Sequence, residues 1–292
     1  MFGPLSLIAL ASAAIADPRP ASPPLLRREI TLGRCRITAF SNGVDRAGAA
    51  IPDRSPAMRN TFLLVVDGHH ILIGPSASGA ELRAALSSLG YRASDVDTVI
   101  VTALDDAQGG GMLDGDRPAF PTATVFVDRW AVDHIGDRAA TGPTIAKALD
   151  AYRARSRLRT PDFDLDVVPG VRMAVTSEGP RTGSVRVRCG ATVLVFWNGD
   201  LREQDRATGT GPAVVPPDRQ RFLEEAVARD HLVATAIGPF PGFGHVYRLA
   251  DGFHWGAIEA RGPRSKPRRR GEIYIEPGND VPVEREVPVP QK

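Results

Sequence analysis

The feature that most constrains the fold is the apolar, β-branched run from Asp97 to Thr102. A strand of this kind has no polar face, so it belongs in a sheet that helices cover. Two further β-rich runs, Asn60 to Val66 and His70 to Ile73, flank an Asp67-Gly68 turn and predict a hairpin. A helix is expected from Ala80 to Leu89, between the hairpin and the buried strand. This order predicts an α/β fold.

The rest of the chain continues this organisation. A short strand is expected from Arg36 to Phe40, and later elements alternate between strand-like runs and amphipathic helices. The later strands are expected at Asp166 to Ala174, Val185 to Cys189 and Thr192 to Trp197, and the later helices at about Thr144 to Arg157 and at Pro217 to Arg229. With 292 residues the chain is long enough to bury a full core as one large domain or two modest ones, and its formal net charge is +2. No apolar run reaches the roughly 20 residues of a membrane-spanning helix.

Several segments, in this order, resemble the metallo-β-lactamase fold family. The resemblance spans about Glu29 to Ile258 and rests on short motifs at strand ends and turns. These motifs are Asn60 to Leu64, Ile71 to Gly74, Asp95 to Thr102, Gly110-Gly111, Phe120 to Val127, Val195 to Asp200 and Phe240 to His245. It implies a single domain built as a four-layered αβ/βα sandwich, with a one- or two-metal site along the shared edge of the sheets. It also implies hydrolysis of lactams, lactones, thioesters or phosphoesters by a metal-bound hydroxide.

The metal-ligand positions depart from the family pattern. In the family, the strand that corresponds to the one ending in Thr102 is followed by the motif His-x-His-x-Asp-His. This chain has other residues at the four ligand positions of that motif. The four residues are Ala103, Asp105, Ala107 and Gln108. The position of the next family histidine corresponds to the segment Gly179 to Ser184, and this segment contains no histidine. The position of the final family histidine corresponds to Ile237. Only the bridging aspartate remains, as Asp200, and the supporting Asp-Thr-Gly turn is replaced by Gly74-Pro75-Ser76.

This donor set is poor for zinc, which needs about three nitrogen, sulfur or carboxylate ligands and a position for water. We therefore expect no resident cofactor. The alternative is a divalent ion: zinc in the family, or a hard ion such as Mg²⁺ or Ca²⁺ held by Asp105, Asp106 and Asp200. The simpler interpretation is that Asp105 and Asp106 cap turns or helices in a solvated loop. Gln108 and His245 complete the set of residues expected near the pocket.

Other catalytic arrangements have less support. Ser76, Ser78 and Ser184 are available nucleophiles, and His245 and His254 are available bases, but no Gly-x-Ser-x-Gly elbow is present. His69 and His70 are neighbours on a strand, so they point to opposite faces and are expected to flank a turn rather than bind one metal. His134 is expected on a helix as a half-buried packing residue, and His231 is expected at a helix end. Gly109-Gly110-Gly111 lacks the Gly-Lys-Ser/Thr of a P-loop and is expected to form the turn into a helix.

The ends of the chain carry separate signals. Residues 1–16 resemble a signal peptide, because Ala14-Ile15-Ala16 follows an uncharged apolar stretch, although no Lys or Arg precedes that stretch. Residues 17–28 form an expected proline-rich linker, residues 29–258 the domain and residues 259–292 a tail. The tail contains six basic residues between Arg261 and Arg270, which could contact a polyanion, whereas nucleic-acid binding is disfavoured because no aromatic residues interleave. In an oxidising compartment Cys35 and Cys189 could pair, and the sequence leaves this open.

These observations favour an exported protein, periplasmic or secreted, with a degenerate metal site. Its expected role is that of a non-hydrolytic pseudoenzyme, or of a binding or regulatory module for a small molecule or a protein. The alternative is a metal-dependent hydrolase with a remodelled carboxylate site. A cytoplasmic protein with an apolar leader is the alternative for its location.

Overall fold

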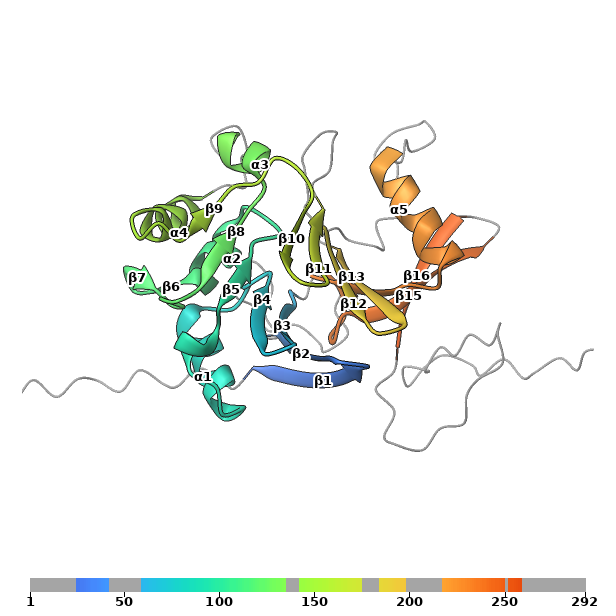
Figure 1. The fold of residues 1–292 in the computed structure, drawn as a ribbon, viewed down its shortest axis with the longest axis horizontal. Coiled ribbons are helices and arrows are strands. Elements are labelled where there is room, and N and C mark those ends of the chain that lie inside the picture. The colour runs from blue at the N-terminus through green and yellow to red at the C-terminus, as the bar shows by residue number, and fades with distance from the viewer. Residues whose placement is uncertain are drawn as a thin grey trace, which may run out of the picture. The chain divides into compact units, whose positions relative to one another are not determined.

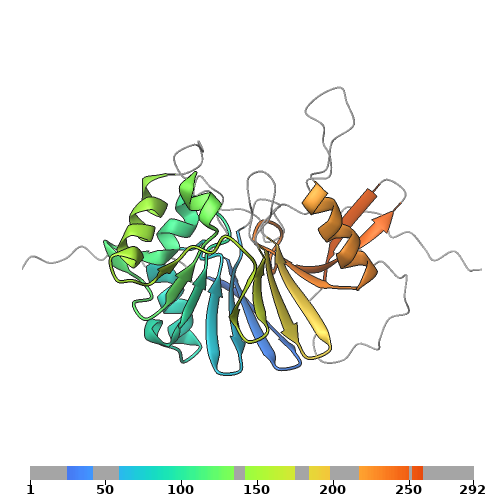
Figure 2. The same ribbon diagram turned by 45° about the horizontal axis from the view of Figure 1, so that its top comes forward.

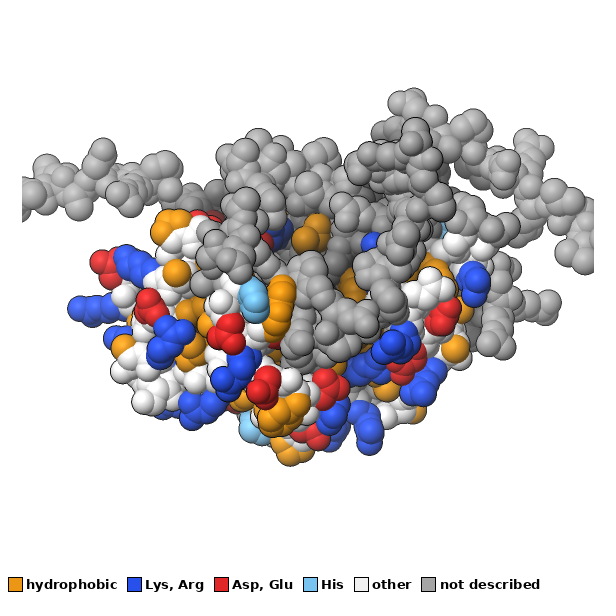
Figure 3. Space-filling view, turned by 90° about the horizontal axis from the view of Figure 1, so that it is seen from above, with side chains coloured by type: hydrophobic (Ala, Val, Ile, Leu, Met, Phe, Trp, Pro, Cys, Tyr) orange, Lys and Arg blue, Asp and Glu red, His pale blue; other side chains and the backbone are white. Residues whose placement is uncertain are grey.

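A computed structural model describes residues 25–41, 59–134, 142–174, 184–197, 217–249 and 252–258. Two seven-stranded sheets face each other, with helices on the outer side of each sheet (Figure 1, Figure 2). The αβ/βα layering expected from the sequence is therefore confirmed. The predicted signal peptide, most of the predicted proline-rich linker, Asp200 and the basic tail lie outside the described residues (grey in Figure 3). Within the described ranges, no helix is long and apolar enough to cross a membrane.

The first sheet comes from the first half of the chain. Its strands in spatial order are β1 (Leu26–Leu32), β2 (Cys35–Ser41), β3 (Thr61–Val66), β4 (His69–Ile73), β5 (Thr98–Ile100), β8 (Thr124–Phe126) and β9 (Leu158–Arg159). Its flanking elements are α1 (Gly79–Ser88), a 3₁₀ turn (Ala93–Asp95), α2 (Asp106–Met112), the ribbon β6 (Leu113–Asp114) and β7 (Arg117–Pro118), α3 (Arg129–Asp133) and α4 (Pro143–Arg153). The first strand of this sheet begins three residues before Glu29, and α4 ends four residues before Arg157.

The second sheet comes from the second half. Its strands in spatial order are β10 (Leu165–Val168), β11 (Val171–Ala174), β12 (Ser184–Cys189), β13 (Thr192–Trp197), β14 (Leu232–Thr235), β15 (Phe243–Leu249) and β16 (Gly252–Ala257). The helix α5 (Pro217–Ala228) packs on its outer face through a cluster that contains Trp197, Phe222 and Trp255. Trp197 stacks on Phe222 with ring centroids 4.2 Å apart.

Local sequence explains the helix boundaries. Ser78 caps α1 with a capping box, in which its side chain accepts from the Glu81 N–H and the Glu81 carboxylate accepts from the Ser78 N–H. The predicted hairpin forms as β3 and β4, with Asp67 and Gly68 both at positive φ in the turn. Gly109 lies inside α2 rather than in a turn, and a Cβ there would stand 2.5 Å from the Ile145 backbone. The glycine run therefore permits close packing of α2 against α4.

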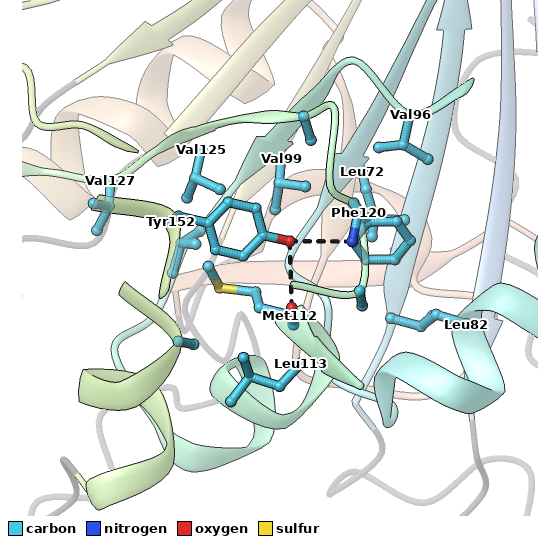
Figure 4. Packing of buried hydrophobic residues seen from close by; sticks show 14 of the residues in the cluster. Leu72, Leu82, Val96, Val99, Met112, Leu113, Phe120, Val125, Val127 and Tyr152 are labelled. Carbon is cyan, nitrogen blue, oxygen red and sulfur yellow. Dashed lines mark hydrogen bonds between the residues drawn. The ribbon is translucent and has the colours of Figure 1, made fainter. Parts of the chain in front are cut away.

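Two buried clusters hold the layers together. One lies between the first sheet and its helices, where Tyr152 accepts a hydrogen bond from the Phe120 N–H and donates to the Met112 carbonyl (Figure 4). Burial raises the pKa of Tyr152 to about 12, so this phenol stays protonated as a donor. The other cluster fills the space between the two sheets and includes Phe62, Phe196 and Phe243.

The two ends of the sheets differ. The "hairpin end" contains the turns at residues 33–34, 67–68, 169–170 and 190–191, where the Arg34 side chain pairs with Asp67 and donates to the Arg188 carbonyl. Cys35 and Cys189 form a disulfide there, between β2 and β12, with Cα atoms 5.4 Å apart. This answers the question that the sequence left open. The "loop end" contains Arg59, Asn60 and Gly74, the segment 101–105 after β5 and the segment 235–238, which begins at the last residue of β14.

Candidate functional site

The candidate site lies at the loop end, where the chain leaves β5 and enters α2. β5 pairs in parallel with β4 and β8, and its backbone continues beyond Ile100 as Val101 donates to the Phe126 carbonyl. Asp105 then caps α2 by accepting a hydrogen bond from the Gln108 N–H at 3.0 Å. The carboxyl end of a central parallel strand is where α/β folds place ligands, so these residues occupy the expected position.

Arg59 pairs with Asp105 at this position. The Nη1 atom donates to Asp105 Oδ2 at 2.7 Å, and the side chains are only 9% and 13% exposed. The second Asp105 oxygen already accepts from the Gln108 backbone, so both carboxylate oxygens are engaged. A permanently charged guanidinium therefore neutralises the carboxylate that the sequence offers first as a metal ligand.

Gln108 also has a structural set of partners. Its Oε1 accepts from the backbone N–H groups of Thr102 and Ala103, at 3.0 and 3.2 Å, and its Nε2 donates to Thr102 Oγ1 at 3.1 Å. The residue is 1% exposed. Its amide therefore fixes the turn between β5 and α2 from inside, and its oxygen is turned toward backbone rather than toward a bound ion.

Asp106 points away from Asp105. Its Oδ1 accepts from the backbone N–H groups of Thr144 and Ile145, at 3.0 and 3.2 Å, in the first turn of α4. The carboxylate thus stabilises a helix N-terminus that its own N-cap, Gly142, leaves without a side-chain cap. The two neighbouring aspartates serve different helices and do not converge on one centre.

His245 lies away from this group. It is on β15 opposite Leu232, the first residue of β14, whereas the loop end begins at the last residue of β14. Its Nδ1 is 3.2 Å from Asp230 Oδ1, just after α5. Asp200 lies outside the described residues, so the structure gives no position for it. Of the five residues expected at the site, Asp105, Asp106 and Gln108 adjoin one another and His245 does not join them.

The other histidines and serines have local partners. Ser78 caps α1, and Ser76 donates to the Gly74 carbonyl at 3.0 Å. Ser184 opens β12 in the second sheet, and the His254 ring stacks on Tyr247 in β15 and β16. His69 and His70 flank the hairpin turn as expected, with His69 beside Asp97 and His70 against Tyr91. His134 is half-buried and stacks on Trp130, as expected for a packing residue, and it lies at the C-cap of α3.

His231 directly precedes β14, and its backbone N–H donates to the Ala226 carbonyl at the end of α5. The residue is 5% exposed. Burial lowers the pKa of His231, and the charge of Glu225 opposes this effect in part. Glu225 is itself held ionised, because its hydrogen bond with Arg186 lowers the Glu225 pKa.

Arg59 and Asn60 are the site residues that the sequence interpretation missed. Arg59 forms an antiparallel bridge with Ile237, and the Asn60 N–H donates to the Ala236 carbonyl at 2.9 Å. The fully buried Asn60 side chain donates to the Thr235 and Gly238 carbonyls, at 3.1 and 3.3 Å. The sequence signal that was available is a charged residue followed by an amide residue, Arg59 and Asn60, directly before an apolar strand. In the same chain a single aspartate, Asp105, occupies one of the four family ligand positions after Thr102.

The residues present do not fit a two-zinc centre. Ala103, Ala107 and Ile237 have no donor atom, and the oxygens of Asp105 and Gln108 are bonded to Arg59 and to backbone. In the part of the chain that the structure describes, no group of three His, Cys, Asp or Glu side chains could hold a metal ion. The donor chemistry thus disagrees with the metal that the fold family implies.

Solved structures confirm the fold. The chain is similar to AidC, a dizinc quorum-quenching lactonase solved in complex with a product, with a TM-score of 0.61 and 16% identity over 82% of this chain and 99% of that one. It is also similar to the hydrolase AbOPH in the beta-lactamase superfamily, with a TM-score of 0.62 and 22% identity over 81% and 98% of the two chains. A probable metal-dependent hydrolase from Staphylococcus aureus matches with a TM-score of 0.51 and 12% identity over 71% and 91%.

These likenesses show that the chain has the metallo-β-lactamase fold over most of its length. No protein-family model and no curated protein sequence matches it. At these identities the similarity establishes the fold, and the chemistry has to be argued from the site.

Proposed function

We propose that this protein is a non-hydrolytic member of the metallo-β-lactamase fold, a pseudoenzyme that serves as a binding or regulatory module. The observation that carries the proposal is the ion pair between Arg59 and Asp105. A guanidinium beside Asp105 places a fixed positive charge where a dication would otherwise have to bind, and the two charges repel. The pair also supplies the neutralisation that a buried aspartate requires.

The hydrogen bonds that the neighbouring residues already form support the same proposal. A metal ion could recruit Gln108 or Asp105 only by breaking the hydrogen bonds that hold the turn between β5 and α2. Asp106 would have to abandon the N-terminus of α4. Each loss leaves buried backbone N–H groups without acceptors, at a cost of about 1–3 kcal/mol per group.

The test is metal content and turnover of the purified, untagged protein. After equilibration with zinc and removal of free ion, we expect well below one equivalent of zinc per chain by mass spectrometry. We expect no divalent-ion-dependent turnover of a panel of lactones, esters, thioesters and phosphoesters that includes N-hexanoyl-homoserine lactone. One or more equivalents of tightly held zinc would overturn the proposal, as would metal-dependent turnover that Asp200→Ala abolishes.

A matched variant tests whether Arg59 is the residue that prevents zinc from binding. Arg59→Met keeps a side chain of similar length and removes the charge, so zinc retention should rise above that of the wild type. Arg83→Met is the control, because Arg83 pairs with Asp114 at the same 2.7 Å but on the surface, with side chains 42% and 39% exposed. Equal zinc retention in all three proteins would count against a role for Arg59 in excluding metal.

We propose further that the protein is exported. The disulfide between Cys35 and Cys189 supports this location, because cytosolic thiols are normally kept reduced. The signal-like residues 1–16 agree with it. A fusion of residues 1–40 to a reporter that is active only outside the cytoplasm should be active, and an inactive but stable fusion would overturn this part of the proposal.

A further inference from the structure

Arg59 uses little of its hydrogen-bonding capacity. A guanidinium has five N–H donors and binds carboxylates best through two parallel hydrogen bonds. Among the described residues, the Arg59 side chain donates only to Asp105, through the single Nη1 contact. An arginine that is nine-tenths buried normally has its donors satisfied, since desolvation of unpaired charge is expensive.

The remaining donors of Arg59 are not enclosed. The fully buried side-chain nitrogens that lack a partner are in other residues, such as Trp197 and Trp255, and none belongs to Arg59. Because the Nε and Nη2 atoms of Arg59 have no hydrogen-bond partner among the described residues and are not fully buried, this free edge of the guanidinium keeps some accessible surface. Arg59 lies at the loop end of the sheets, where its backbone forms a bridge with that of Ile237.

The charge and the apolar side chain beside Arg59 determine which class of ligand its free edge can bind. Asp105 already supplies one negative charge, so the pair is neutral, and a second acceptor of single charge can share the guanidinium. A dianionic phosphate would face stronger repulsion from Asp105 at short range. The adjacent Ile237 side chain is apolar and partly exposed, and it offers a surface to a hydrocarbon group.

We propose that the free edge of Arg59 binds the carboxylate of a small organic acid whose apolar part lies toward Ile237. This inference rests on the proposed function, because it assigns a ligand class to the same site. Arg59 acts as the specificity-determining residue, and Asp105 holds its guanidinium in place while weakening the attraction for a second anion.

The probe pair is hexanoate and hexanamide, which share a shape and differ in charge. Titration of the full mature chain, followed by the Arg59 side-chain N–H resonance and by calorimetry, should give a Kd for hexanoate about tenfold or more below that for hexanamide, as expected for a charge-assisted hydrogen bond. In Arg59→Met the two Kd values should become equal. In Asp105→Asn the Kd for hexanoate should fall below the wild-type value, since repulsion is removed.

Arg83→Met is the matched control and should keep the wild-type preference. If Arg59→Met does not fold, two other variants still test the inference. Arg59→Lys should weaken hexanoate binding, and Asp105→Asn should strengthen it. Equal affinity for hexanoate and hexanamide in the wild type, or a preference that Arg59→Met retains, would overturn the inference. Zinc measured on the same preparation tests the proposed function separately: bound zinc would refute that function, whereas zinc-free protein without the preference would refute only the ligand assignment.

Discussion

At the hairpin end the two sheets are joined by a covalent bond, whereas at the loop end they are joined by the backbone and side-chain hydrogen bonds of Arg59 and Asn60 to the segment after β14. The disulfide side chains at the hairpin end are at most 1% exposed and carry no polar donors. The loop end buries an ion pair and an asparagine. The difference separates two tasks: one end secures the sandwich, and the other keeps polar groups in fixed positions near the surface.

Removing the covalent connection is expected to have the largest effect. The double variant Cys35→Ala/Cys189→Ala should lower the free energy of unfolding by about 3–5 kcal/mol, because the bond closes a sequence separation of 154 residues in the unfolded chain. Guanidinium denaturation of the oxidised protein and the variant measures it. A loss below about 1 kcal/mol would show that the hairpin end is secured by packing alone.

Breaking the ion pair at the loop end should come next. Asp105→Ala removes the N-cap of α2 and leaves Arg59 without a partner, and we expect a loss of about 2–4 kcal/mol. Adding Arg59→Met to this variant should recover part of the loss, since the unpaired buried charge disappears. The exposed pair gives the control: Asp114→Ala should cost under about 1 kcal/mol. Equal losses for the two aspartates would contradict the assigned burial effect.

The asparagine beside the ion pair should have a smaller effect. Asn60→Ala removes two hydrogen bonds to the carbonyls of Thr235 and Gly238, so the expected loss is about 1–3 kcal/mol. Amide hydrogen exchange should rise in the segment 235–238 and stay unchanged at the Cys35 end of β2. An increase at both ends would show that the two connections are not independent.

The smallest expected effect is a pH dependence at the hairpin end. Because the folded pKa of His231 lies below 6.5, the unfolded chain binds the proton first, so the histidine's contribution to stability is present above about pH 6.5 and is lost as pH falls toward its folded pKa. His231→Gln should flatten the stability profile between about pH 6.5 and 5. Thermal melts across that range measure the slope, and an unchanged slope would locate the dependence elsewhere.

The sequence predicted the architecture well because its strongest signals are local. The Asp67-Gly68 turn, the Ser78 start of α1 and the strand runs each specify their own conformation, and the order of elements then limits the topology. The pairing of Cys35 with Cys189 could not be derived, since it depends on how two distant strands face each other. The α/β class followed from the pattern and the four-layered sandwich from the resemblance to the fold family, whereas the pairing of the two cysteines required the three-dimensional structure.

The candidate site was predictable only in part, for a physical reason. The absence of histidine at Ala103, Ala107 and Gln108 is visible in the sequence, but the partner of Asp105 is Arg59, which lies 46 residues away along the chain. The opposed directions of Asp105 and Asp106 depend on where α4 begins in space. The expectation that these carboxylates cap helices agrees with their hydrogen bonds, although Asp105 is largely buried rather than in a solvated loop.

The cysteine content has a consequence for how the protein is made. Because the chain holds only two cysteines, an isolated molecule can form just one disulfide, and that bond is the native one. The first cysteine leaves the ribosome long before the second, so an early oxidant finds Cys35 alone and can only couple it to another molecule. Errors in biogenesis should therefore be seen as reducible oligomers rather than as scrambled monomers.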